Sequence, residues 1–354
     1  MYESMMCKYI GLDNYLFWKT AFEILKMSQG DVPRWRKGGK GKVTAKSVPS
    51  VKKKRFGQYM ERYWPLYAML ILPMAFCLLF KYWPMTGLAM AFKNFKIVRG
   101  IWGSPWNGLD NFKYLFSRPE SVGVILQTLK LNVFDLLFGF PMPIILAVML
   151  NEVRNKTFKR VTQTVIYLPH FLSWVIIASL FIMMLRTETG MVNIISSSMG
   201  GKKVPYLEDN LLWQVVYIFI GVWQSMGWGT IIYLAAITGI SSELYEAATV
   251  DGAGRFAKIW HITLPGIRGT VVTLLIMNLG RILGSSFERV NSLSNPYVVL
   301  KSANVISTYI YRVGLANGKY HYATAMGLFQ NVIGILLILV SDRVAKSMGE
   351  SGLI

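Results

Sequence analysis

Polar and aromatic side chains recur inside the long apolar segments of this 354-residue chain, and they are the side chains best placed to do chemistry. Flat aromatic rings stack on the faces of sugars, while amides and guanidinium groups donate hydrogen bonds to hydroxyls or carboxylates. Because an ionisable group in hydrocarbon is costly, it usually faces a cavity or a partner. Several of these side chains lie three or four residues apart, which places them on one helix face. The resulting candidates for a substrate path are Trp223, Gln224, Trp228, Asn278 and Arg281, with His170 and Trp174 behind them.

Plainer explanations exist for the same residues. Trp side chains near the ends of membrane spans commonly anchor at the interface. Arg281 has possible acidic partners in Asp135 and Glu288, which would make it a structural cation. If Arg281 instead faces the path, it favours an acidic ligand.

Motifs for catalysis are weak. The three His residues lie in different segments, with no grouping typical of a hydrolase triad or a zinc site. The segment 252–257 fits a dinucleotide-binding pattern but follows an expected helix instead of a strand. The glycine-rich tract 38–42 lacks the first Gly and the final Ser or Thr of a phosphate loop. We therefore expect no catalytic residues, metal or cofactor in this chain, and no ATP hydrolysis by the chain alone.

The composition predicts a membrane protein. Hydrophobic residues make up 53% of the chain and charged residues only 16%. Apolar runs long enough to cross about 30 Å of hydrocarbon predict an all-α polytopic fold with six transmembrane helices, which places both termini on one side. The predicted spans are 65–84, 125–150, 164–185, 211–236, 270–287 and 326–342.

Basic residues orient these spans. Fourteen of the 38 Lys and Arg residues precede residue 65, and four more lie in the short loop 151–163. Because basic residues flank the cytoplasmic ends of spans, these segments are expected inside the cell, with both termini cytoplasmic. The polar loop 241–265 then falls inside too.

The amino-terminal region is expected to be a cytoplasmic basic extension over residues 1–62. Its tract 34–62 carries much of the net charge of +20 without the interleaved aromatic residues of a nucleic-acid platform, so membrane lipid is the expected partner. Residues 1–33 either form an amphipathic surface segment or are an untranslated upstream stretch. No signal peptide is recognisable. The expected organisation continues with the first transmembrane helix and extracellular loop (63–124), a membrane core that includes the cytoplasmic loop 241–265 (125–343) and a cytoplasmic tail (344–354).

The loop 241–265 contains the most informative pattern in the chain. Residues 246–265 read EAATVDGAGRFAKIWHITLP. Ser241 or Ser242 can cap a first helix, and Gly252 can end it in the left-handed conformation. A second short helix is expected from Arg255 to Trp260, ending before Pro265.

The spacing of this pattern resembles the EAA loop of ABC importer permeases at every position of the signature. The resemblance implies that the first helix sits in a groove of an ATPase subunit and that Gly252 allows the sharp turn. The residues implied in ATPase coupling are Glu246, Ala247, Ala248, Asp251, Gly252, Leu264 and Pro265.

The resemblance covers roughly residues 59–343. The segments 104–112, 150–155, 167–174, 295–296 and 322–329 resemble the LplB-like branch of oligosaccharide permeases. It implies a type I importer in the plasma membrane of a bacterium, with a second homologous permease, two ATPase subunits that bind ATP and Mg, and an extracellular solute-binding lipoprotein. The expected function is oligosaccharide import by alternating access, and Arg281 favours an acidic, uronate-containing oligosaccharide.

Two other classes are weaker. A secondary transporter driven by an ion gradient would favour membrane carboxylates, and Asp135 is the only clear acidic residue inside a predicted span. A membrane-bound enzyme would need clustered catalytic carboxylates or His.

Overall fold

The structure is a computed structural model that describes residues 56–284, 286–294, 301–349 and 352. The predictions for residues 1–55 and for Asn295 and Pro296 lie outside these residues. In the described part of the chain the regular structure is helical, and a single isolated bridge joins Lys93 and Trp106. The chain divides into two compact units at Leu88 and Ala89.

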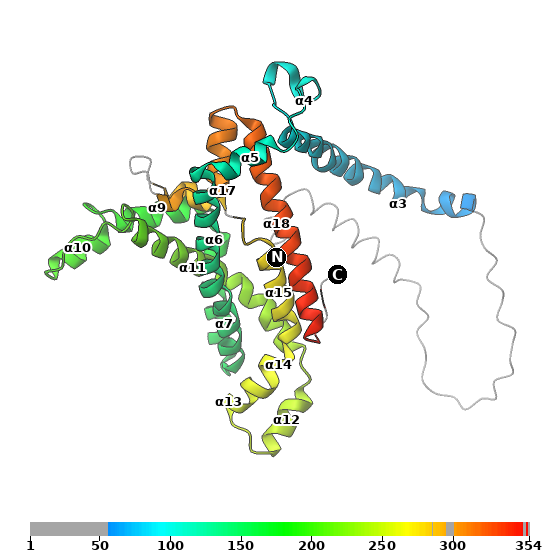
Figure 1. The fold of residues 1–354 in the computed structure, drawn as a ribbon. Coiled ribbons are helices and arrows are strands. Elements are labelled where there is room, and N and C mark those ends of the chain that lie inside the picture. The colour runs from blue at the N-terminus through cyan, green and yellow to red at the C-terminus, as the bar shows by residue number, and fades with distance from the viewer. Residues whose placement is uncertain (1–55, 285, 295–300, 350–351, 353–354) are drawn as a thin grey trace, which may run out of the picture. The chain divides into compact units, whose positions relative to one another are not determined.

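The first unit is built around one long helix. The helix α3 spans Phe56–Cys77 and continues through a π-helical stretch at Leu78–Tyr82 into a 3-10 segment at Trp83–Phe92 (Figure 1). Pro65 and Pro73 lie inside α3 and remove backbone donors, which membrane helices tolerate better than soluble ones. The helical stretch Tyr63–Phe92 is long and apolar enough to cross a membrane, and it contains the predicted first span, 65–84.

The second unit contains the other candidate spans. Among the described residues, four helical stretches of the chain are long and apolar enough to cross a membrane, and the number rises to six if each of two bent helix pairs counts as one span. The straight ones in this unit are formed by α6 (Pro119–Gly139) with α7 (Pro141–Glu152), by α11 (Asn210–Thr238) and by α18 (Tyr320–Ser347). The bent pairs are formed by α8 (Lys156–Tyr167), a 3-10 turn (Leu168–Phe171) and α9 (Trp174–Leu185), and by α13 (Arg255–Lys258), a π turn (Ile259–Thr263), α14 (Leu264–Gly266) and α15 (Arg268–Gly280).

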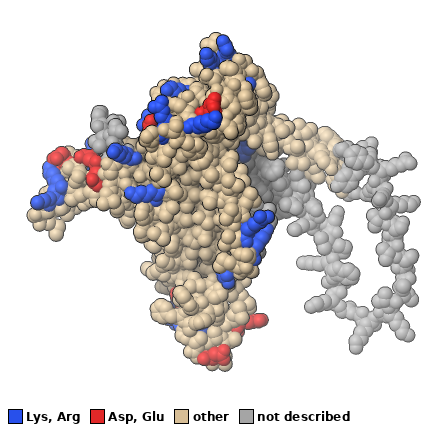
Figure 2. Space-filling view, viewed as in Figure 1, with Lys and Arg blue, Asp and Glu red and all other residues tan. Residues whose placement is uncertain are grey.

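This unit also contains several short helices and turns. They are α4 (Gly100–Gly103), α5 (Asp110–Ser117), α10 (Met191–Ser198), α12 (Ser242–Val250), α16 (Phe287–Leu293) and α17 (Ile306–Ile310), with 3-10 turns at Ile97–Arg99 and Lys301–Ala303 and a π turn at Tyr311–Ala316. Figure 1 places α12 and α13 at one end of the unit, beyond the last turn of α7, and α5 and α17 at the opposite end. On the face shown in Figure 2, charged side chains are sparse across the middle and gather toward the ends, as expected for a membrane-spanning unit.

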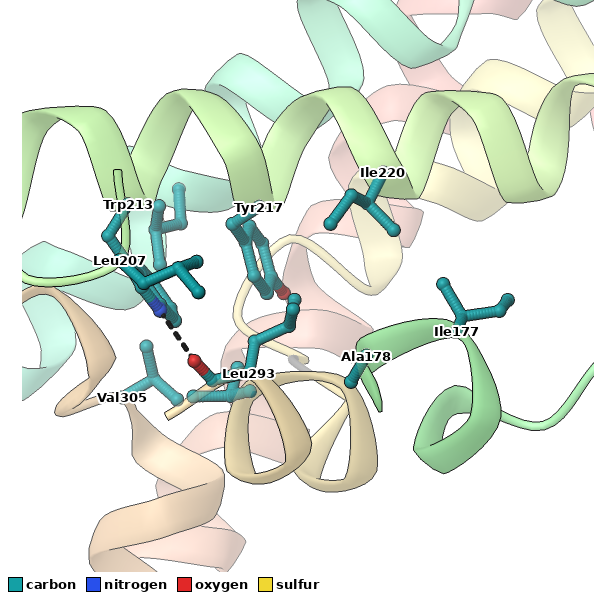
Figure 3. Close-up of a cluster of buried hydrophobic side chains, with 10 residues drawn as sticks. Ile177, Ala178, Leu207, Trp213, Tyr217, Ile220, Leu293 and Val305 are labelled. Atoms are coloured by element: carbon teal, nitrogen blue, oxygen red, sulfur yellow. Dashed lines mark hydrogen bonds between the residues drawn. The ribbon is translucent and has the colours of Figure 1, made fainter. Parts of the chain in front are cut away.

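A buried cluster joins α11 to helices distant in sequence. Trp213 and Tyr217 of α11 are fully buried against Ile177 of α9 and Leu293 of α16. The Trp213 indole nitrogen donates a hydrogen bond of 3.0 Å to the Leu293 carbonyl (Figure 3). This contact satisfies the polar atom of a buried ring and fixes α16 on α11.

The third predicted span, 164–185, is not one straight helix. Its two halves are bent by 99° around Leu172 and Ser173. Leu172 is extended, and the Ser173 hydroxyl accepts a hydrogen bond from the backbone of Ile176, so Ser173 starts a new helix. Pro169 tightens the turn just before the break.

The fifth predicted span, 270–287, extends too far. The helix α15 ends at Gly280, and Arg281 is its carboxyl cap with φ near −103°. Asn278 and Arg281 therefore do not lie on one continuous helix, contrary to the prediction. With 13 residues α15 is about 20 Å long, shorter than about 30 Å of hydrocarbon.

Candidate functional site

The loop 241–265 folds into the predicted helical hairpin. Ser241 is the amino-terminal cap of α12, because its hydroxyl accepts a 3.3 Å hydrogen bond from the Glu243 backbone. Glu243 in the first turn complements the positive end of the helix dipole. Glu246 and Ala247 are exposed on α12, and Ala248 is half-buried.

Gly252 makes the turn, as the sequence predicts. Its φ is +75°, in the left-handed region that favours glycine. The turn is closed by a 2.8 Å hydrogen bond from the Ala253 backbone to the Ala248 carbonyl, and by one of 3.0 Å from the Asp251 backbone to the Ala247 carbonyl. A Cβ at Gly252 would meet nothing within 4 Å, so the backbone conformation and not crowding selects glycine.

The second helix of the hairpin does not stop before Pro265, contrary to the prediction. The helical path of α13 continues through the π turn Ile259–Thr263 into α14, which contains Leu264 and Pro265. Pro265 occupies the first turn of α14, where a missing backbone donor costs little. Leu264 packs with a buried cluster that includes Ile267, so the hairpin joins the membrane part without a flexible linker.

Side-chain hydrogen bonds hold the two arms of the hairpin together. The Tyr245 hydroxyl lies 3.0 Å from the hydroxyl of Thr263, which is buried. The Lys258 ammonium donates to the Thr249 hydroxyl at 2.7 Å. Both contacts join α12 to the segment that leads into α14 and α15.

The hairpin also carries large apolar side chains exposed to solvent. Val250 and Phe256 are 88% and 87% exposed, and Trp260 is 69% exposed. An apolar surface on a polar loop is typical of a protein contact.

The predicted path residues on α11 lie at different depths of the packing. Gln224 is buried, whereas Trp223 is half-buried and meets the Phe181 ring edge-on at 5.6 Å. The Trp228 ring stacks on His170 with 5.0 Å between centroids. The structure therefore brings Trp228 and His170 together, and their predicted place on the path stays a prediction.

Arg281 lines a pocket and makes no ion pair with any residue that the structure describes. The pocket has a volume of about 420 Å³ and is lined by Gly280, Arg281, Gly284, Gln330, Asn331, Gly334, Ile335 and Ile338. Asn278, one turn earlier, is exposed, and its amide donates to the Leu274 carbonyl of its own helix at 2.8 Å. Sequence reasoning missed Gln330 and Asn331, although two adjacent amides inside an apolar span are a usable signal.

Asp135 pairs with Arg289, which sequence reasoning also missed. Both Arg289 amino groups donate to the Asp135 carboxylate at 2.9 Å, and one also donates to the Tyr217 carbonyl. The guanidinium lies 3.7 Å from the Tyr217 ring centroid and 5.3 Å from that of Trp174. A Cβ at Gly221 would lie 1.8 Å from the Arg289 side chain, so Gly221 provides the space for this ion pair. Trp174 thus packs on a structural cation.

Comparison with known proteins extends the match beyond the hairpin. Residues 139–349 match the family described as "Binding-protein-dependent transport system inner membrane component". The chain is 42% identical over 288 residues to Protein LplB of Bacillus subtilis (strain 168), covering 81% of this chain and 90% of that protein. It is 43% identical over 288 residues to the polygalacturonan/rhamnogalacturonan transport system permease protein YteP of the same organism, covering 81% and 89%.

A solved structure agrees with the fold. A chain of a bacterial alginate ABC transporter, crystallised with an alginate pentasaccharide-bound periplasmic protein, superposes with a TM-score of 0.77 at 41% identity. The match covers 85% of this chain and 100% of that chain. With its helical hairpin, its membrane-length helices and these matches, the chain belongs to the binding-protein-dependent inner membrane components and is a permease subunit of an ABC transporter.

Proposed function

We propose that this permease imports oligosaccharides that carry carboxylates. The observation that carries the proposal is the shared character of its relatives: one is named for polygalacturonan and rhamnogalacturonan, and another belongs to a transporter of alginate, an acidic polysaccharide. Arg281 in an open pocket supplies a cation suited to such a ligand.

ATP binding and hydrolysis take place on two partner ATPase subunits, which also hold Mg. The exposed face of α12, with Glu246, Ala247 and Ala248, docks in a groove of one ATPase, and Gly252, Leu264 and Pro265 fix the angle of the hairpin. The hydrogen bonds of Tyr245 with Thr263 and of Lys258 with Thr249 support this role, because they join α12 to the segment that leads into α15. Nucleotide binding then shifts the population between inward-facing and outward-facing states.

The remaining partners follow from the same proposal. The exposed apolar side chains of the second unit contact lipid and a second, homologous permease. An extracellular solute-binding lipoprotein delivers the sugar, as supported by the periplasmic protein in the similar alginate complex. The chain lies in the plasma membrane of a bacterium with both termini in the cytoplasm.

An ion-gradient-driven secondary transporter is the alternative. Such a protein needs a carboxylate that gains and loses its ion during transport. Asp135 is held by two hydrogen bonds from Arg289, and this arrangement disfavours that role.

Uptake into proteoliposomes tests the proposal. The chain is purified with its partner permease and ATPases, and uptake of a uronate trisaccharide is measured with its binding protein outside and ATP inside. We expect uptake that needs ATP and persists with an ionophore. Uptake that continues without ATP and stops with the ionophore would establish the alternative.

A further inference from the structure

Two glycines bring α15 and α18 into direct contact. A Cβ at Gly334 would lie 2.5 Å from the Gly280 carbonyl oxygen, and a Cβ at Gly280 would lie 2.3 Å from the Ile338 side chain. At Gly334 the clash is with backbone, so a larger residue there forces the helices apart. The crossing therefore places Arg281, which follows Gly280, beside the helix turn of α18 that precedes Gly334.

The pocket that Arg281 lines lies beside this crossing, because Gly280 and Gly334 line it too. One guanidinium and the amides of Gln330 and Asn331 line it, together with apolar surface from Ile335 and Ile338. Its volume of about 420 Å³ falls in the range of about 300–1,000 Å³ typical of small-ligand sites. Apolar surface with a few convergent polar groups is the usual composition of such sites.

The polar groups of this pocket are not used by the fold. Of the two acidic partners suggested by the sequence, Asp135 is bound to Arg289, and Glu288 makes no ion pair with Arg281 among the described residues. Within the described part of the chain, no ion pair of Arg281 is found, and Gln330 and Asn331 make no side-chain hydrogen bond. Arg281 and Asn331 are also exposed. Polar groups at a membrane helix surface are costly unless water or a ligand contacts them.

The depth of the pocket argues against the lipid surface. Gln330 lies ten residues after Tyr320, the first residue of α18, which corresponds to about 15 Å along a helix of 28 residues. The predicted span 326–342 begins four residues before Gln330, so the amides lie at least about 6 Å inside the apolar stretch. Lipid phosphates lie at the surface of the bilayer, outside this stretch.

We propose that the pocket at the α15 and α18 crossing is a subsite for one acidic sugar unit, with Arg281 binding its carboxylate and the amides of Gln330 and Asn331 binding its hydroxyls or ring oxygen. The proposal rests on the proposed function. The planar guanidinium of Arg281 matches a carboxylate through two parallel hydrogen bonds, which a neutral sugar does not provide. Gln330 and Asn331 then add affinity for the sugar ring, whereas Arg281 sets the preference for the acidic sugar.

Equilibrium binding to the complete transporter in nanodiscs, without the binding protein, tests this subsite. The probes are trigalacturonate and its carboxyl-reduced, neutral form, in zwitterionic lipid. The variants are Arg281→Gln, Arg281→Lys, Gln330→Leu and Asn331→Leu, with Arg343→Gln as the control, because Arg343 is an exposed arginine on α18 outside the pocket. Thermal stability and assembly are measured for each variant.

We expect Arg281→Gln to weaken binding of the acidic probe by about ten- to hundredfold, as for a lost charge-assisted hydrogen bond, and binding of the neutral probe by less than about threefold. Arg281→Lys should recover part of the loss. Gln330→Leu and Asn331→Leu should weaken both probes about equally, and Arg343→Gln should change neither. If Arg281→Gln fails to assemble, the two amide variants still test the site, and unchanged binding in both overturns it.

Three further results overturn the subsite proposal alone. One is an equal loss of both probes in Arg281→Gln, which indicates a structural role. Another is a lipid site: Arg281→Gln binds both probes as the wild type does, and added anionic lipid lowers the probe affinity of the wild type but not of the variant. The third is a wild type that transports the acidic probe with ATP yet shows no preference for it over the neutral probe; this leaves the proposed function intact. A wild type without ATP-dependent uptake overturns both.

Discussion

Gly252 is the residue at which the backbone alone decides the geometry of the hairpin. Its φ of +75° costs a β-branched residue about 1–3 kcal/mol. We predict that Gly252→Val leaves membrane insertion intact, because Gly252 lies outside the candidate spans, but lowers substrate-stimulated ATP hydrolysis by about tenfold, the factor for about 1.4 kcal/mol. The measurement is ATPase activity of the reconstituted complex.

Gly254 offers a matched control for this substitution. It lies two residues away with a φ of −70° and open space around its Cα. Gly254→Val should therefore retain most of the stimulation. Equal stimulation in the two variants would remove the coupling role of the Gly252 turn.

Arg289 is the residue on which the buried ion pair depends. Arg289→Leu leaves the Asp135 carboxylate, whose side chain is 31% exposed, without its partner. Such losses cost about 3–5 kcal/mol for fully buried pairs, and the partial exposure of Asp135 favours the low end. We predict a clear fall in the melting temperature of the purified complex.

The double variant Arg289→Leu with Asp135→Leu separates charge from packing. It should recover part of the lost stability, because no unpaired charge remains. A double variant less stable than Arg289→Leu would show that packing of Arg289 on Tyr217 matters more than its charge.

At this scale the sequence predicts local conformation better than distant contacts. The Ser241 cap and the Gly252 turn follow from neighbouring residues and are confirmed. The choice between Arg281 and Arg289 as partner of Asp135 depends on how helices far apart in the chain pack together. Asn111 is buried and donates hydrogen bonds to the carbonyls of Ala91 and Lys93. These contacts also depend on how distant parts of the chain pack together.

At the scale of elements, the crossing of α15 and α18 depends on small residues. Gly334→Ala places a Cβ 2.5 Å from the Gly280 carbonyl, so the helices must separate. Overpacking of this kind costs about 1–3 kcal/mol. We predict a lower melting temperature and a weaker preference for the acidic probe.

Gly327 of the same helix is the control for the crossing. A Cβ there would lie 3.7 Å from the Ile310 side chain, an ordinary contact. Gly327→Ala should leave the melting temperature within about 1 °C of the wild type, since surface or well-accommodated changes stay within about 0.5 kcal/mol. Equal destabilisation by both variants would contradict the importance of the crossing.

Apolar length predicts where helices lie in the membrane but not where they break. The straight spans 125–150, 211–236 and 326–342 are confirmed, because each lies within a long continuous apolar stretch. The break at Ser173 and the end of α15 at Gly280 were not predicted. A helix that is apolar on all sides shows no hydrophobic periodicity, so the sequence gives no sign of a bend. A serine in such a segment can either cap a new helix or lie within a continuous one, and the sequence does not distinguish the two.

At the scale of the whole molecule, the arrangement of charges predicts a single orientation in the membrane. In a background with Cys7→Ser and Cys77→Ser, a cysteine at Ser198 in α10 should react with an impermeant reagent in intact cells. A cysteine at Val250, which is 88% exposed on α12, should react only after permeabilisation. Labelling is read by mass shift. The reverse pattern would invert the orientation and remove the ATPase contact from α12.

Gly221, Arg289 and Asp135 also bear on how related genes diverge. A side chain at position 221 collides with Arg289, loss of Arg289 strands Asp135, and loss of Asp135 strands Arg289. Any one of these mutations on its own therefore gives a protein less stable than its parent. Descendants of this gene should therefore keep all three residues or replace them together. The substrate pocket, by contrast, can change one residue at a time.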